Sequence, residues 1–324
     1  MLRYIIKRLL LMIPTLIGVT IIVLLFIMIT PGDPARLLAG SQASEEQVEA
    51  IREQMGLNDP FPVRYTNYIG NMFKGDFGTS YTTKRPVLGE VLQRIPYTLM
   101  LVSISMGLAI VIGIPLGIFA ATHQYSWKDN AAIFITLFFV SMPAFWFALM
   151  LVQLVCVKLQ ILPVAGTDTW LGWVLPCVTL ALGFAASVAR QIRSDLLEVI
   201  RQDYITTARA KGQTERKVLY KHALKNAVIP TIMTIGGIFG MTLGGSMITE
   251  VIFSIPGLGN YTIKALMSRD YPVIQTSVLF ISVLFCIVLL LVDLVFAVVD
   301  PRIRAQYSRK KIKAKIEKKE EALQ

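Results

Sequence analysis

Charged residues are scarce in this chain of 324 residues. Asp, Glu, Lys and Arg make up 16% of the sequence, whereas soluble globular domains carry about 25%. Hydrophobic residues make up 54%, and the mean hydropathy is +0.60. A chain with this composition buries its apolar surface in lipid, where a backbone satisfies its own hydrogen bonds as helices. The composition therefore predicts an all-α integral membrane protein.

Residues that commonly carry chemistry are also few. The three cysteines, Cys156, Cys177 and Cys286, lie in apolar stretches without metal-ligand spacing and are interpreted as small buried hydrophobic residues. His123 and His222 are the only histidines. The sequence contains no G-x-x-x-x-G-K-[ST] nucleotide-binding motif and no zinc-finger or RNA-binding motif. We therefore expect a chain without catalytic residues, metal or cofactor of its own, and attribute the net charge of +11 to membrane topology.

Long apolar runs predict six transmembrane helices. The first is too long for a signal peptide and lacks a small-residue cleavage site, so it is interpreted as an uncleaved span. The predicted spans are 9–29, 97–120, 131–152, 173–189, 228–249 and 276–299.

Basic residues set the orientation of these spans. With both termini inside, the cytoplasmic segments carry 22 of the 32 Lys and Arg and the external segments carry 10. Because Lys and Arg mark the side that is not translocated, this asymmetry predicts six spans with both termini in the cytoplasm.

The spans divide the chain into four parts. We expect an N-terminal transmembrane helix (1–30), an external helical segment (31–95), a permease-like core (96–299) and a basic cytoplasmic tail (300–324). Ser44 and Gln47 form a capping-box pattern, and a second helical stretch follows at 63–73. The external segment is therefore predicted to form a small helical cap.

The cytoplasmic loop at 190–227 is the most basic part of the core, with nine Lys or Arg between Arg190 and Lys225. Asp195 and Glu198 read as a capping box, and Gly212 suits the left-handed end of a helix. A short helix held out on the cytoplasmic face predicts a docking element for a cytoplasmic partner.

The spans contain few ionisable groups that could couple transport to an ion gradient. Glu250 lies at the outer end of the fifth span and Asp293 lies late in the sixth, and the two form no relay. Together with the basic loop and the missing nucleotide site, this favours a permease driven by a separate ATPase. An ATP-independent secondary transporter or channel and a membrane scaffold or insertase component remain the alternatives.

Short runs spread over 1–304 carry a family resemblance. They are PGDPA at 31–35, GDFGTS at 75–80, SMPAFW at 141–146, DYI at 203–205, ARAKG at 208–212, HALKNA at 222–227, PGLG at 256–259, RDYP at 269–272 and DPRIR at 300–304. In this order they resemble the first permease subunit of bacterial dipeptide/oligopeptide ABC importers, a family that also serves glutathione and nickel chelates.

The resemblance implies a type I importer fold in the inner membrane. The expected partners are a second related permease, two nucleotide-binding ATPase subunits that hold ATP and Mg²⁺, and an external solute-binding protein. Di- or oligopeptides are the expected solute, with glutathione or a nickel chelate as alternatives, and the pathway residues are not identified.

The resemblance also implies a helix that couples the permease to its ATPase. The family's Glu-Ala-Ala…Gly motif maps onto this loop, although Thr206 and Thr207 replace the Glu and the first Ala. Small residues would let the helix enter a groove, and Arg209 and Lys211 would pair with acidic groups of the ATPase. The expected coupling residues are Asp203, Thr206, Thr207, Ala208, Arg209, Ala210, Lys211 and Gly212.

Overall fold

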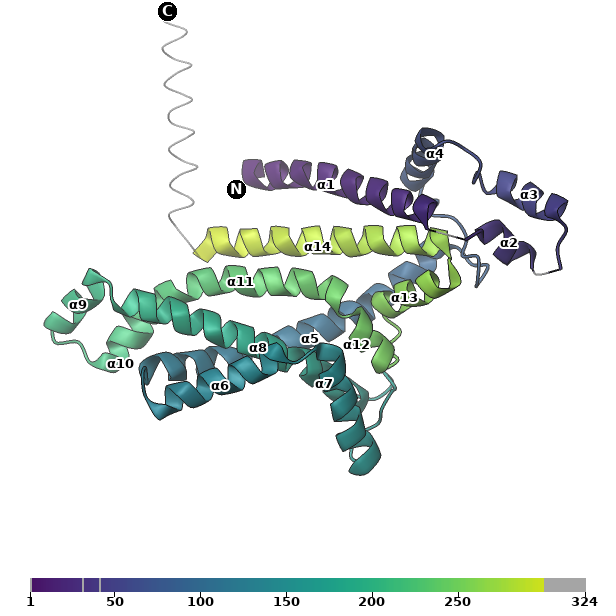
Figure 1. Ribbon diagram of the computed structural model, residues 1–324. Helices are drawn as coiled ribbons and strands as arrows, with labels where there is room; N and C mark the ends of the chain where they lie inside the picture. Colours follow the sequence, from purple (N-terminus) through teal and green to yellow (C-terminus); the bar gives the residue numbers. More distant parts are fainter. Residues whose placement is uncertain (1, 31, 41, 300–324) are drawn as a thin grey trace, which may run out of the picture. The chain divides into compact units, whose positions relative to one another are not determined.

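The computed structural model describes residues 2–30, 32–40 and 42–299. Apart from one isolated bridge between Thr79 and Pro86, the regular structure of these residues is helical (Figure 1). The predicted tail at 300–324, with the DPRIR run, lies outside the described residues. The helices are α1 (Leu2–Ile29), α2 (Pro34–Ala39), α3 (Glu45–Gln54), α4 (Phe61–Phe73), α5 (Val87–Thr122), α6 (Trp127–Ser141), α7 (Ala144–Leu151), the π-helix η1 (Val152–Lys158), α8 (Leu171–Ile200), α9 (Asp203–Ala210), α10 (Glu215–Lys217), the π-helix η2 (Val218–Ala223), α11 (Leu224–Gly245), α12 (Met247–Ile252), α13 (Leu258–Ser268) and α14 (Tyr271–Val299).

Five stretches of the described chain are long and apolar enough to cross a membrane. A sixth candidate exists only if α6 and the α7–η1 stretch, which are joined by a sharp bend, count as one span. The five stretches are Ile5–Ile29, Val87–Thr122, Leu171–Ile200, Glu215–Gly245 and Tyr271–Phe296.

The predicted span at 131–152 is not one continuous helix. The helix stops at Ser141, and Met142 adopts an extended conformation with φ −78° and ψ 130° before Pro143. Proline disfavours helical geometry in the residue before it and donates no backbone hydrogen bond. The apolar run is therefore divided into two helices.

The chain folds into two compact units, and both draw on stretches that are far apart in sequence. The first comprises Met1–Ser105, Pro143–Leu180 and Gly240–Cys286, and the second comprises Met106–Met142, Ala181–Phe239 and the described residues from Ile287 onwards. Four helices, α5, α8, α11 and α14, contribute residues to both units.

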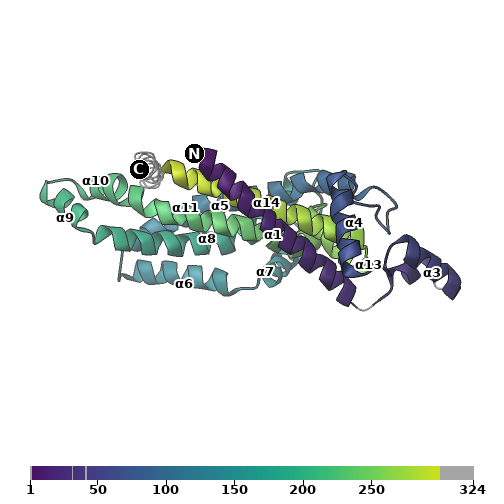
Figure 2. The same ribbon diagram turned by 90° about the horizontal axis from the view of Figure 1, so that it is seen from above.

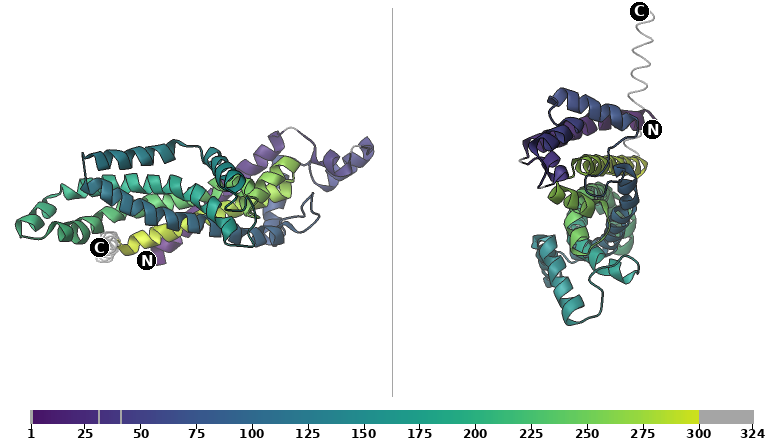
Figure 3. Two further views of the ribbon diagram at one scale, coloured as in Figure 1. Left: turned by 90° about the horizontal axis from the view of Figure 1, so that it is seen from below. Right: turned by 90° about the vertical axis from the view of Figure 1, so that its right-hand side faces the viewer.

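In the first unit, residues from several helices pack into one apolar core. Val87 and Val91 of α5, Leu258 of α13 and Tyr271 of α14 are buried in one apolar cluster. The short helices α2, α3 and α4 follow the end of α1 in this unit (Figures 1 and 3). The predicted helical cap thus consists of these three helices.

Both helix predictions for the external segment are confirmed. The Ser44 hydroxyl accepts a hydrogen bond from the backbone of Gln47, whose side chain accepts one from the backbone of Ser44. Val48 of the same helix is buried, and α4 begins two residues before the predicted start. On α4, the Tyr65 hydroxyl lies 3.1 Å from the Thr20 hydroxyl of α1.

In the second unit, α6, α8 and α11 run side by side (Figures 1 and 2). Gly113 and Gly117 of α5 face α8 so closely that a Cβ at Gly113 would lie 2.6 Å from the Ala185 carbonyl oxygen. At Gly117 an added Cβ would reach 3.0 Å from the Ala189 Cα atom and would overlap Ile192. Glycine is therefore required where these two helices touch.

The predicted capping box at Asp195 was wrong. Asp195 lies inside α8, and its carboxylate accepts hydrogen bonds from Gln191 at 2.8 Å and from the Thr231 hydroxyl of α11 at 2.8 Å. These partners satisfy the carboxylate without a free helix terminus. The helix continues for another five residues to Ile200.

Candidate functional site

The predicted docking element corresponds to α9, which lies in the second unit (Figure 1). It spans Asp203–Ala210 and is followed by Lys211 and Gly212. Gly212 has φ +74°, the left-handed geometry that its position predicted, and its amide donates to the Arg209 carbonyl at 2.9 Å. The helix is therefore sharply terminated, and the chain turns back toward α10.

Two residues anchor α9 to its own chain. Ile205 and Ala208 are buried against Leu196 of α8 and against Val218 and Ala223 of η2. This corrects the expectation that Ala208 is free to enter a partner's groove.

The opposite face of α9 is open. Thr206, Thr207 and Ala210 are exposed, as are Lys211 and Gly212 beyond the helix. A Cβ added at Gly212 would meet no atom within 4 Å. Asp203 at the start of α9 is exposed as well, so the available contact surface consists of small side chains together with one carboxylate and one lysine.

Of the two cations expected to contact a partner, Arg209 and Lys211, Arg209 is already paired within the chain. Arg209 is held by Glu215 of α10, with nitrogen–oxygen distances of 2.8 and 3.3 Å, so its charge is already compensated within the chain. Tyr204 also binds within the chain, because its hydroxyl accepts a hydrogen bond from Asn226 of α11 at 2.8 Å. Both contacts fix α9 relative to the helices that follow it.

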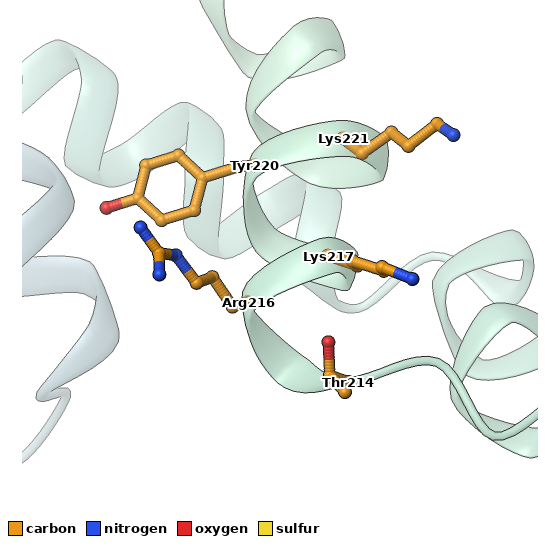
Figure 4. A pocket seen from close by; sticks show the side chains of 5 residues that line it. All are labelled: Thr214, Arg216, Lys217, Tyr220 and Lys221. Carbon is orange, nitrogen blue, oxygen red and sulfur yellow. The ribbon is translucent and has the colours of Figure 1, made fainter.

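Basic side chains lie on two sides of the next helical turn. Figure 4 shows Arg216 extending toward the ring of Tyr220, whereas Lys217 and Lys221 point together to the other side. With Thr214 they line an open hollow of about 460 Å³. A larger groove of about 1010 Å³ runs from Arg216 and Tyr220 to Phe119 and His123 at the end of α5.

Buried polar contacts connect α6, α8 and α11 in the second unit, which also contains α9. Asp129 of α6 is almost fully buried and accepts two hydrogen bonds from Arg193 of α8, at 2.8 and 2.7 Å. The bidentate geometry is the strong form of an arginine–carboxylate pair. With the Asp195–Thr231 contact, it links α6, α8 and α11 in the second unit.

A second group of functional candidates lies in the first unit. The Asp270 carboxylate accepts hydrogen bonds from the Ser80 hydroxyl at 2.6 Å and from the Thr82 amide at 3.1 Å. The Arg269 guanidinium lies against Gly32, where any Cβ would collide with it. The runs at 31–35, 75–80 and 269–272 therefore meet in space, although nearly 240 residues separate the first from the last.

Glu250 fixes the PGLG run in the same unit. Its side chain is fully buried and accepts hydrogen bonds from the Thr98 hydroxyl at 2.7 Å and from the Asn260 amide at 2.8 Å. A Cβ at Gly257 would lie 2.5 Å from the carboxyl carbon, so only glycine allows this approach. Burial raises the pKa of Glu250, and the hydrogen bonds offset part of that rise.

Sequence reasoning did not identify the contacts of Asp270, Arg269 and Glu250 as a site, although the runs that make these contacts carried the resemblance. Their side-chain contacts are non-local, and no periodicity reports them. Among the residues that the structure describes, no group of three or more His, Cys, Asp or Glu could hold a metal ion.

Comparison with known proteins shows which family the sequence matches. The family described as binding-protein-dependent transport system inner membrane component matches residues 113–305, and its N-terminal component matches residues 1–102. The glutathione transport system permease protein GsiC of Escherichia coli K12 is 42% identical over 304 residues, covering 94% of this chain and 99% of that protein. The protein of the same name from Pectobacterium atrosepticum has the same identity and coverage.

A solved structure shares the fold. The MetNI methionine ABC transporter in an inward-facing conformation aligns with a TM-score of 0.56 at 20% identity. The alignment covers 65% of this chain and 96% of the transporter chain. At this identity the likeness concerns the fold alone, which is that of a type I importer permease.

Proposed function

Because this chain belongs to the family of binding-protein-dependent inner membrane transport components and is a permease subunit of an ABC importer, we propose that it takes up short peptides. It forms half of a channel with a second, related permease, and both of its termini lie in the cytoplasm. An external solute-binding protein delivers the solute, and two ATPase subunits inside hold the ATP and Mg²⁺ that drive transport.

The relatives support glutathione as the first solute to test. They are named as glutathione transport permeases and match nearly the whole chain. Glutathione is itself a short peptide, so it falls within the proposed solute class. Nothing in the described residues favours a nickel chelate over a peptide.

The single observation that carries the mechanism is the two-faced docking helix. The inner face of α9 is buried with α8 and η2, and its outer face presents small exposed residues. When the ATPase subunits close, they pull this helix, and the buried contacts pass the movement to the spans. The solute site then changes its side of access as the helices tilt together.

The test is to block the outer face without disturbing the inner one. Gly212→Trp and Ala210→Trp each place a bulky side chain where the structure leaves open space. Ala210 has ordinary helical geometry, so its variant avoids the strain that a positive φ imposes at residue 212. In vesicles holding the whole importer, uptake of labelled glutathione and of a dipeptide should fall at least tenfold in both variants.

Asn130→Trp is the matched control, since Asn130 is an exposed residue of α6 outside α9. It should retain uptake and ATP hydrolysis. Unchanged uptake in both α9 variants would refute the coupling role. Uptake that needs no ATP in the unmodified importer would instead favour a secondary transporter.

A further inference from the structure

An open pocket of about 290 Å³ lies where α1 meets the external segment in the first unit. It is lined on one side by Ile27, Met28 and Leu57 and on the other by polar groups. The polar groups that bear on the argument are Asp33, Arg52, Arg64 and Tyr271. A pocket of this size accepts the end of a small molecule and excludes a folded surface.

The pocket has an excess of positive charge. Asp33 is its one lining carboxylate, and it is already engaged by Arg52 at 2.5 Å and by the Ala35 amide at 3.0 Å. Burial raises the pKa of Asp33, but these hydrogen bonds outweigh that effect and lower it, so the carboxylate stays ionised. Arg52 also forms an ion pair with Glu49. The carboxylates of Asp33 and Glu49 are therefore both paired with Arg52.

Two further guanidinium groups have no such partner. Arg64 of α4 lines the pocket and makes no hydrogen bond or ion pair to any described residue. Arg269 lies against Gly32, another lining residue, and it likewise has no acidic partner among the residues described. Both guanidiniums lie near Tyr271, as does the Asp33 carboxylate.

Tyr271 supplies a buried donor that lacks an acceptor. The residue is 6% exposed, lines the pocket, and its hydroxyl makes no hydrogen bond to any described atom. A buried polar group without a partner destabilises the folded state, because it has lost its hydrogen bonds to water. Arg64 lines the pocket with Tyr271, and Arg269 lies against the lining residue Gly32, so an anion that enters the pocket meets two uncompensated guanidiniums and gives the phenol the acceptor it lacks.

We propose that Arg64, Arg269 and Tyr271 form an extracytoplasmic subsite for the carboxylate of the arriving peptide. A carboxylate has two acceptor oxygens in a plane, which matches the forked donors of arginine. The inference rests on the proposed uptake of short peptides, and it names the part of the solute that this permease contacts. The apolar wall of Ile27, Met28 and Leu57 faces the adjoining part of the solute.

The test compares one tripeptide as its free acid and as its C-terminal amide. Vesicles holding the whole importer receive excess solute-binding protein, preloaded with either form of trialanine, and the initial ATP-dependent uptake is measured. Because the same binding protein delivers both forms, its own preference cancels when the acid-to-amide rate ratio of a variant is divided by that of the unmodified importer. Arg64→Gln with Arg269→Gln should lower this ratio about tenfold or more, since hydrogen bonds to a charged group are lost.

Two single variants sharpen the result. Tyr271→Phe removes only the hydroxyl and keeps the ring in its apolar cluster, so it should lower the ratio by a smaller factor. Lys74→Gln removes an exposed positive charge that follows α4 but does not line the pocket. It should leave the ratio within twofold of the unmodified value.

Direct contact is read out separately, without ATP, by a diazirine-bearing tripeptide whose cross-links are mapped by mass spectrometry. The free acid should label residues 27–34 or α4, and the double arginine variant should lose this labelling. An unchanged rate ratio together with unchanged labelling would overturn the proposal. An equal fall of both rates with weaker docking of the binding protein would also overturn it, because the carboxylate would then belong to that protein. Absence of ATP-dependent uptake of either form by the unmodified importer would be a failure of the proposed function, and labelling would still decide the subsite.

Discussion

Replacing Glu250 tests whether its buried carboxylate stabilises the contacts between α5, α12 and α13 in the first unit. Glu250→Ala removes the acceptor of the Asn260 backbone amide, which has no freedom to turn elsewhere, and of the Thr98 and Ser246 hydroxyls. One orphaned buried donor costs about 1–3 kcal/mol, and the cavity left by a buried side chain adds to that cost. We expect a total destabilisation of about 3–5 kcal/mol.

Glu250→Gln is the matched variant, because it keeps the volume and one acceptor oxygen. Its amide NH₂ would face one of the donors that the carboxylate now accepts, so we expect a smaller cost of about 1–2 kcal/mol. The measurement is the free energy of unfolding in mixed micelles by denaturant titration. An alanine variant within about 1 kcal/mol of the unmodified chain would refute the assigned role of this network.

The pH dependence of the same variants gives an independent check. Burial raises the pKa of folded Glu250 above its unfolded value, so the folded state holds the proton more tightly. Its contribution to stability is therefore fully present below the unfolded pKa and is lost as pH rises through the folded pKa. Glu250→Gln should remove this part of the pH dependence, and an identical pH profile in the variant would contradict it.

Two further predictions concern the second unit. Arg193→Met leaves Asp129 buried without its cation and should destabilise by about 3–5 kcal/mol, whereas Arg209→Gln, in the more exposed pair with Glu215, should cost less than about 1 kcal/mol; equal melting temperatures of the two variants would contradict this. Gly117→Ala forces a Cβ into Ala189 and Ile192 and should lower the melting temperature, whereas Gly107→Ala meets no atom within 4 Å and should raise it slightly. A neutral Gly117→Ala would show that α5 and α8 are not in close contact there.

Local patterns predicted local features well. The family resemblance, the all-α membrane fold and the importer function are confirmed. The capping box at Ser44 and the left-handed turn at Gly212 formed as predicted, because each depends on a few adjacent residues. The topological division of the chain and the coupling role of α9 stay predictions.

The same local reasoning failed where tertiary contacts competed with it. Asp195 and Glu198 have the spacing of a cap, yet Thr231, 36 residues away, satisfies Asp195 and the helix runs on. The apolar run at 131–152 has the hydropathy of one span, but the proline at 143 divides it. Hydropathy measures partition into lipid and does not register the geometry of one peptide unit.

The amino-acid sequence by itself determined the membrane class, the position of most spans and the short helix α9, because composition, hydrophobic runs and capping residues act over a few turns of helix. Only the tertiary structure decided which helix faces are buried and which distant residues come into contact. It buried Ala208 against its own chain, and it brought Gly32 against Arg269 and Ser80 against Asp270. Contacts between residues nearly 240 positions apart depend on how helices pack, and that packing is a property of the whole chain.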